Sequence, residues 1–169
     1  MKWIGITGSW RATNKQVEKD VRREVSKIIK AGNGIVTGGA LNVDYFAADE
    51  VLKNNPNCNQ IKIFLPTTLE IYSRHYFKRA DEGVITYAQA KGLILLLTKI
   101  KEINPSSIIE NLANSILDKS SYFQRNQDVV DVSDELLAFH VNSSEGVKDT
   151  INKAKKKNIS IRIFEYKIK

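Results

Sequence analysis

Short apolar segments alternate with longer segments of helical periodicity along the chain. The apolar segments are WIGIT, GIVT, IKIFLP, ELLAFHVN and ISIRIFEY, which begin at residues 3, 34, 61, 135 and 159. Between the first two, Val17, Val21, Val25 and Ile29 recur at the spacing of a helix with one buried face. Regular alternation of strands and helices is typical of a parallel sheet that is covered by helices. We therefore predict an α/β fold with a doubly wound, mostly parallel sheet, a Rossmann-like three-layer sandwich.

The five predicted strands and their helices fit one domain that covers residues 1–169. No Pro-, Gly- or Ser-rich stretch has the composition of a linker, and no internal repeat is present. Residues 67–118 interrupt the alternation and are predicted to be a helical insertion. We expect one helix there over about 81–101 and a second near 106–117.

Charge and cysteine content limit the partners that this chain can have. Lys and Arg number 26 against 19 Asp and Glu, so the net charge of +7 permits binding to nucleic acid or other polyanions. The single cysteine, Cys58, cannot form an internal disulfide, and no Cys/His cluster predicts a metal or a cofactor. The chain begins without the apolar core of a signal peptide, and no apolar run reaches the roughly 18–20 residues of a membrane span. We expect a cytoplasmic protein without a membrane partner.

Small and hydroxylic residues follow four of the predicted strands. They are Gly8 and Ser9 after the first, Gly38 and Gly39 after the second, Pro66, Thr67 and Thr68 after the third, and Ser143, Ser144, Glu145 and Gly146 after the fourth. Ligands of doubly wound sheets bind beyond the carboxyl ends of the strands, where free backbone N–H groups and helix dipoles favour phosphate. The first junction, GITGSWRATN, lacks the GxGxxG motif of dinucleotide-binding proteins, and no GK[ST] ending of a P-loop is present. The pattern predicts a phosphate site outside these two classes.

Four stretches together carry a resemblance to a known family. They are TGSWRATN, IVTGGALNVDYFAADEVLK, YFQRNQDVVDVSDELLAFHVN and SSEGVKDTINKAKKKNISIRIF, in this order. The chain resembles the SLOG superfamily of Rossmann-like domains. It is most similar to the domain of the bacterial DNA-processing protein A (Smf), and less similar to the Lonely Guy phosphoribohydrolases. The resemblance leaves out residues 67–118, and because relatives often dimerise, it also implies a homodimer.

The resemblance implies that the first two junctions contribute to a phosphate site. Gly8 and Ser9 fall where relatives approach a phosphate. The family's GGA turn is matched by Gly38, Gly39 and Ala40. Asp44 matches the acidic residue of the family's GxD step, although it could equally be a helix-start residue favoured by the helix dipole. Asn42 stands where a glycine is usual, and Asn is the residue that best tolerates the left-handed backbone region after Gly.

An Arg-Asn pair of the family, which precedes a helix and a strand, is matched by Arg125 and Asn126. The resemblance implies that Arg125 binds phosphate through two parallel hydrogen bonds and that Asn126 fixes the loop. The alternative is an ordinary surface pair that caps a helix.

The last loop separates an enzyme from a binding protein. Lonely Guy proteins carry a GGxGTxxE loop, whose hydroxyl and backbone hold the phosphate and whose Glu assists cleavage of the N-glycosidic bond. The corresponding stretch here is SSEGVKDT, in which Val147 replaces the Thr and Thr150 stands where the Glu is expected. Asp149 is adjacent, but neighbouring residues on a helix point about 100° apart. Glu145 and Asp149 therefore remain the only catalytic candidates in this loop.

The noncatalytic loop of the DNA-processing family is SGS-like. Ser144 and Gly146 resemble it better than the enzyme loop, and the resemblance implies that they bind phosphate. Outside the loops, His75 lies in a basic and aromatic run that could bind bases or form a solvated helix face. His140 lies in an apolar strand and is expected to be structural, and the lysines of KAKKK are expected to solubilise a helix end.

Three functions remain open from the sequence. The first is noncatalytic binding of a nucleotide or a nucleotide-derived phosphorylated ligand at the strand ends, as in a sensor. The second is binding of single-stranded DNA or another nucleic acid, as in DNA-processing protein A. The third is a nucleotide N-glycosidase or phosphoribohydrolase activity.

Overall fold

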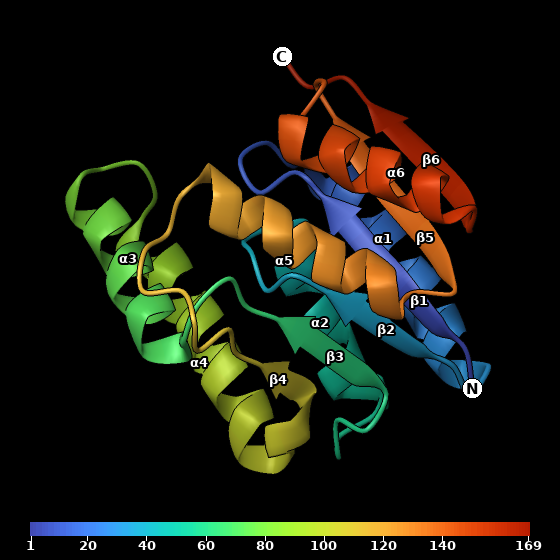
Figure 1. Cartoon of the computed structure of the whole chain (residues 1–169), viewed down its shortest axis with the longest axis horizontal. Coiled ribbons are helices and arrows are strands. Elements are labelled where there is room, and N and C mark those ends of the chain that lie inside the picture. The colour runs from blue at the N-terminus through green and yellow to red at the C-terminus, as the bar shows by residue number, and fades with distance from the viewer.

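The computed structural model describes residues 1–169 as a six-stranded, entirely parallel sheet with helices on both faces (Figure 1). The strands are β1 (Trp3–Gly8), β2 (Gly34–Thr37), β3 (Ile61–Phe64), β4 (Ile108–Ile109), β5 (Glu135–Val141) and β6 (Ser160–Tyr166). Their order is β4-β3-β2-β1-β5-β6. The predicted α/β, Rossmann-like three-layer fold is confirmed.

Helices cover the two faces of the sheet in pairs. They are α1 (Lys15–Lys30), α2 (Val43–Asn54), α3 (Leu69–Asp81), α4 (Tyr87–Ile103), α5 (Lys119–Val132) and α6 (Glu145–Lys157), with a 3-10 turn at Pro105–Ser107. α1 and α2 pack on one face, and α5 and α6 pack on the other. None of the helices combines the length and the apolar character that crossing a bilayer requires.

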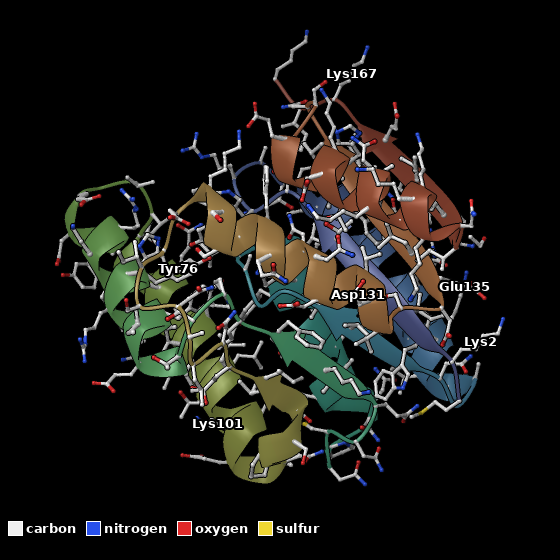
Figure 2. All side chains as sticks on the ribbon, in the orientation of Figure 1. Lys2, Tyr76, Lys101, Asp131, Glu135 and Lys167 are labelled. Carbon is white, nitrogen blue, oxygen red and sulfur yellow. The ribbon has the colours of Figure 1, made fainter.

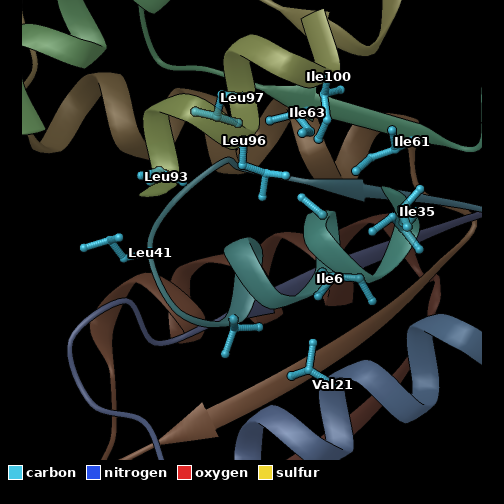
Figure 3. Packing of buried hydrophobic residues seen from close by; sticks show 14 of the residues in the cluster. Ile6, Val21, Ile35, Leu41, Ile61, Ile63, Leu93, Leu96, Leu97 and Ile100 are labelled. Atoms are coloured by element: carbon cyan, nitrogen blue, oxygen red, sulfur yellow. The ribbon is translucent and has the colours of Figure 1, made fainter. Parts of the chain in front are cut away.

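Side-chain alternation along the strands divides the core into two clusters. The larger cluster contains Val21 of α1, Ile6 of β1 and Ile35 of β2, together with apolar residues of α2 and α4 (Figure 3). On β5, Leu137 faces this cluster, whereas its neighbour Leu136 faces a smaller cluster under α5 and α6. Successive residues of a strand point to opposite faces, so β5 holds both layers of helices to the sheet.

The strand order reverses at β1. This strand pairs with β2 on one side and with β5 on the other, so the chain leaves the first half of the sheet and returns beside its own first strand. The loops after β1 and β5 then diverge toward opposite faces. Such a switch point opens a crevice at the carboxyl ends of the strands.

The predictions for the segment 67–118 were wrong in detail. The helix expected over about 81–101 forms as α4, which begins later, at Tyr87, and the preceding helix α3 was not predicted. α3 ends at Asp81, and Gly83 in the turn between the two helices has a φ of +74°. Thr68 and Thr86 cap the two starts through their side chains, a signal that indicates both helix boundaries. A glycine at positive φ ends a helix readily because it has no Cβ to clash.

The helix expected near 106–117 does not form. Ile108 and Ile109 instead form the edge strand β4, which pairs with β3 and adds a sixth strand to the five predicted. Two residues are too few to show the alternation by which strands are recognised. Residues 110–118 contain turns and bends.

The KAKKK stretch has a more specific role than solubility. The ammonium group of Lys157 donates hydrogen bonds to the carbonyl oxygens of Val130, Asp131 and Ser133, at 2.9, 2.7 and 2.8 Å. Carbonyl groups at a helix end have no intrahelical partner. Lys157 therefore caps the end of α5 and holds α6 against it.

Candidate functional site

A cavity of about 840 Å³ lies at the carboxyl ends of β1 and β5. The loop after β1, the GGA turn after β2, the first turn of α6 and one face of α5 form its inner walls. α3 and the α3–α4 loop form an outer wall, on the other side of α5 from α6 (Figure 1). Its volume lies in the range of cavities that hold small ligands.

Ten of the twelve candidate residues named from the sequence line this cavity. They are Gly8, Ser9, Gly38, Ala40, Asp44, Arg125, Asn126, Ser144, Glu145 and Gly146. Gly39 and Asp149 do not line it. A Cβ at Gly39 would instead meet Leu65 and Ile63 of the core, at 2.8 and 2.9 Å.

The two consecutive glycines after β2 serve different purposes. Gly39 has a φ of +71°, a conformation that L side chains rarely adopt. Gly38 makes room for a side chain, because a Cβ there would lie 2.5 Å from the guanidinium carbon of Arg125. The GGA turn therefore combines a tight backbone turn with a seat for a buried cation.

Arg125 lies in the middle of α5 rather than before a helix, and it is 9% exposed. Its Nη1 donates to the carbonyl oxygen of Gly38, and its Nε donates to Oδ1 of Asn126 at 3.2 Å. The chain provides it with no carboxylate ion pair. Burial opposes the charge of Arg125, but nearby acidic groups, among them the carboxyl of Asp44, outweigh this effect and raise the pKa of the guanidinium. Three of its five N–H donors remain without a protein acceptor.

A polarised chain of hydrogen bonds fixes the orientation of Arg125. Nδ2 of Asn126 donates to Oδ2 of Asp149 at 3.1 Å, while the other end of the amide accepts from Arg125. The ammonium of Lys153 donates to both oxygens of Asp149, at 2.6 and 2.5 Å. A guanidinium only donates and a carboxylate only accepts, so the Asn126 amide has a single favourable orientation. Asp149 therefore orients Asn126 and does not itself line the cavity.

Asp44 lies at the start of α2 and is 6% exposed. Its Oδ2 accepts a hydrogen bond from the N–H of Ala40 at 3.0 Å, which closes the GGA turn. Burial raises the pKa of this carboxyl, and the charge of Arg125 only partly offsets that effect. Asp44 therefore begins α2 and also lines the cavity.

The first turn of α6 is open toward the cavity. Ser144 is the residue before this helix, and no side chain caps the first N–H groups, which have no intrahelical partner. The preceding residues Asn142 and Ser143 have φ values of 49° and 59°, and this conformation directs the helix start at the cavity. A Cβ on Gly146 would meet nothing within 4 Å. Such a helix start favours an anion.

The carboxylates of this loop are poorly placed for catalysis. Thr150, at the position of the Lonely Guy glutamate, donates its hydroxyl to the carbonyl oxygen of Gly146 at 3.0 Å. Glu145 has a side chain that is 82% exposed and pairs with Lys119 of α5 at 3.6 Å. No carboxylate of the first turn of α6 is buried, and burial is what raises the pKa of a general acid.

The outer wall contains the basic and aromatic run around His75, for which the sequence left base binding and a solvated helix face as alternatives. His75, Tyr76 and Arg79 of α3 and Tyr122 of α5 line the cavity, and Tyr72 lies behind Tyr76. Nε2 of His75 lies 3.4 Å from the hydroxyl of Tyr122, and burial lowers the pKa of the imidazole. The basic and aromatic run was visible in the sequence, but only the packing of α3 against α5 directs it inward.

Asn42 has a strained backbone and joins the loop after β2 to the loop after β1, beside the cavity. Asn42 has φ +63° and ψ −106°, which lies outside the left-handed well that Asn tolerates. Its Nδ2 donates to the carbonyl oxygen of Trp10 at 2.5 Å, and the guanidinium of Arg11 lies over the Trp10 ring. The positive φ expected for Asn42 is present, and its side chain also joins the loops that follow β1 and β2.

Pro66, Thr67 and Thr68, which follow β3, do not line the cavity, and neither do His140 and Cys58. His140 is half-buried on β5, and its Nε2 has no hydrogen-bond partner. Cys58 is fully buried in the larger core cluster, and burial raises the pKa of its thiol. Neither contributes to the strand-end cavity.

Comparison with known proteins supports the fold. No known family profile matches the sequence, and no curated protein matches it. One similar structure is that of DNA processing protein A from Helicobacter pylori, which was solved for its single-stranded DNA binding mode. Its TM-score is 0.68 and its sequence identity is 20%, and the match covers 96% of this chain and 64% of that one. DNA processing protein A from Streptococcus pneumoniae has a TM-score of 0.52 and 14% identity over 95% of this chain and 58% of that one.

A third solved structure, of the protein TM1055, has a TM-score of 0.56 and 14% identity over 95% of this chain and 72% of that one. The chain spans about three fifths of the length of the two DNA processing protein A structures. Similarity at these identities shows a common fold. The chain therefore shares the Rossmann-like fold of the DNA processing protein A structures.

Proposed function

We propose that this chain binds a nucleotide or a nucleotide-derived phosphorylated ligand in the strand-end cavity, without turning it over. The observation that carries the proposal is the buried Arg125, which has free donors and no carboxylate partner. Asp44 is near enough to stabilise the charge of Arg125 but makes no ion pair with it, so three N–H donors have no acceptor. An anion that accepts from these donors in a buried site gains more than it would at a surface. The open first turn of α6 supplies backbone donors for the same anion.

The rest of the cavity suits the remainder of a nucleotide. Trp10, Tyr122 and Phe123 give it aromatic surface, and Val84 and Ile85 give it apolar surface. Aromatic rings stack on bases of any kind. In this arrangement the phosphate binds at Arg125 and the nucleoside lies toward α3 and Trp10.

The proposal is tested by calorimetric titration of the protein, freed of nucleic acid, with pyrophosphate, ribose 5-phosphate and a panel of nucleotides. Arg125→Ala is the test variant. Arg74→Ala is the matched control, because Arg74 is exposed on α3, pairs with Glu70 and does not line the cavity. Loss of two charge-assisted hydrogen bonds should weaken phosphate binding about ten-fold or more in Arg125→Ala. Equal affinities of Arg125→Ala and Arg74→Ala would contradict the proposal.

Binding of single-stranded DNA is a second candidate. It is favoured by the fold shared with the Helicobacter pylori protein and by the cations Arg11, Arg79 and Lys119 at the cavity. Here Arg125 would hold one backbone phosphate and the exposed cations its neighbours. The logarithm of the affinity for an oligonucleotide should then fall with that of salt concentration by roughly 0.7 per phosphate neutralised. A small nucleotide should show a much weaker salt dependence.

A further inference from the structure

A pair of tyrosines on α3 closes one side of the cavity. Tyr72 and Tyr76 lie one helical turn apart, so both side chains project from the same face of the helix. Tyr72 is fully buried behind the wall, whereas Tyr76 is 6% exposed and lines the cavity. Their rings pack edge to face with centroids 4.9 Å apart. Figure 2 shows Tyr76 on the side of α3 that faces α5.

The hydrogen bonds of this pair determine where each hydroxyl proton lies. The hydroxyl of Tyr72 is 3.0 Å from the carbonyl oxygen of Gly39. A carbonyl oxygen can only accept, so Tyr72 donates its single hydroxyl proton to Gly39. The two tyrosine hydroxyls are 3.3 Å apart, so in this contact Tyr76 has to be the donor. Burial raises the pKa of both hydroxyls, which therefore keep their protons at neutral pH. The Tyr76 oxygen is left with accepting capacity alone.

This acceptor belongs to the same end of the cavity as Arg125. Arg125 and Tyr72 donate to the carbonyl oxygens of the neighbouring residues Gly38 and Gly39, and the guanidinium carbon of Arg125 lies 5.5 Å from the centroid of the Tyr122 ring. The wall thus offers donors from Arg125 and, beside them, an oxygen that can only accept. A ligand that placed a phosphate or carbonyl oxygen against Tyr76 would bring two acceptors together without a proton between them.

We propose that Tyr76 is a specificity-determining residue that selects phosphorylated ligands with a hydrogen-bond donor, either a sugar hydroxyl or an exocyclic amine, next to the phosphate. The proposal rests on the proposed function, because it assumes that the phosphate is held by Arg125. It goes further by stating which chemical group has to accompany the phosphate. A site built to pair with such a group rejects analogues without it, because the buried acceptor is left unsatisfied.

The experiment compares five ligands by calorimetry: AMP, its 2′-deoxy and 3′-deoxy forms, purine riboside 5′-monophosphate and ribose 5-phosphate. The deoxy forms lack one sugar hydroxyl each, and purine riboside monophosphate lacks the amine. We expect one analogue to bind the wild-type protein about ten-fold more weakly than AMP. The deoxy analogues identify a hydroxyl and the purine riboside identifies the amine as the donor.

Two variants test the assignment to Tyr76. In Tyr76→Phe the acceptor is gone, so AMP and the weak analogue should bind within two-fold of each other. In Tyr72→Phe the proton of Tyr76 is released and can turn toward the ligand, which should also reduce the discrimination. Unchanged melting temperatures would show that both variants fold.

The outcomes separate this inference from the function beneath it. Arg125-dependent binding of AMP, its two deoxy forms and purine riboside 5′-monophosphate with equal affinity would overturn the role of Tyr76 and leave the proposed function in place. Discrimination that persists in Tyr76→Phe would overturn it as well, and discrimination that persists in Tyr72→Phe would contradict the proton assignment. Absence of any Arg125-dependent binding would overturn both proposals.

Discussion

Replacing Gly38 by Ala tests whether this glycine exists to seat Arg125. A Cβ at this position would lie 2.5 Å from Cζ and Nη1 and 2.7 Å from Nε of Arg125. Separations below 3.0 Å require a shift, and the guanidinium, as the end of a flexible side chain, is the group that can move. It then loses its bonds to Gly38 and Asn126. Because this movement relieves the clash, the lost hydrogen bonds of a buried charged group predict a loss of about 2 kcal/mol in the free energy of unfolding.

The assay is urea denaturation of a double-mutant cycle. If the clash with Arg125 is the cause, Gly38→Ala should cost only about 0.5 kcal/mol when Arg125 is already Ala, since the two residues then no longer interact. Phosphate binding should also be weakened about ten-fold by Gly38→Ala alone, because the cation is displaced. Gly92→Ala is the control: it lies inside α4, where its Cβ would meet only the Tyr45 hydroxyl at 4.0 Å, and it should stabilise by about 1 kcal/mol. An unchanged cost of Gly38→Ala in the Arg125→Ala background would refute the reasoning.

Three further predictions concern Asn42, the carboxylate candidate and acid stability. Asn42→Gly should be more stable to urea than Asn42→Ala by about 1–2 kcal/mol, because both lose the bond to Trp10 but only Gly suits the positive φ. Glu145→Gln should raise phosphate affinity about two-fold in calorimetry by removing an exposed like charge, whereas an N-glycosidase would lose base release in a chromatographic assay. Burial disfavours the charged forms of Asp20 and Glu24, but hydrogen bonds to their carboxylates outweigh this effect and lower both pKa values. Gln16 and Tyr166 donate to Asp20, and Lys27 and Arg23 donate to Glu24. The stability that they contribute is present above their unfolded pKa values near 4 and lost as pH falls through the folded ones, so Glu24→Gln should flatten the loss of melting temperature below about pH 5.

The pattern of strands and helices was largely predictable from the sequence, because local periodicity is read residue by residue. Five of the six strands and the helix over residues 14–30 follow from apolar spacing and capping residues. The edge strand β4 was missed since two residues carry no period, and it forms because β3 offers it unpaired backbone groups. The starts of α3 and α4 are set by the caps Thr68 and Thr86.

The strand-end position of the site was also predictable, because residues that follow parallel strands meet at one edge of the sheet. The order of the strands was not, and it is this order that brings the loop after β1 beside the loop after β5. The resemblance to a family indicated Arg125 and Asn126 as candidate site residues, because the sequence around them matches the family. It could not show that both residues are buried in the middle of α5.

What each residue does at the site was decided by packing across the chain. Gly38 looked like a phosphate-binding glycine, yet its missing side chain makes room for Arg125, which is 87 residues away in sequence. Asp149 was a catalytic candidate, yet its carboxylate is held by Lys153 and by the amide of Asn126. The acceptor on Tyr76 follows from a chain of hydrogen bonds that ends at Gly39. The sequence by itself determined which elements form and which edge of the sheet carries the polar loops, because both follow from local spacing. Only the tertiary structure decided the charge, burial and hydrogen-bond direction of the site, because these depend on side chains that the fold brings together.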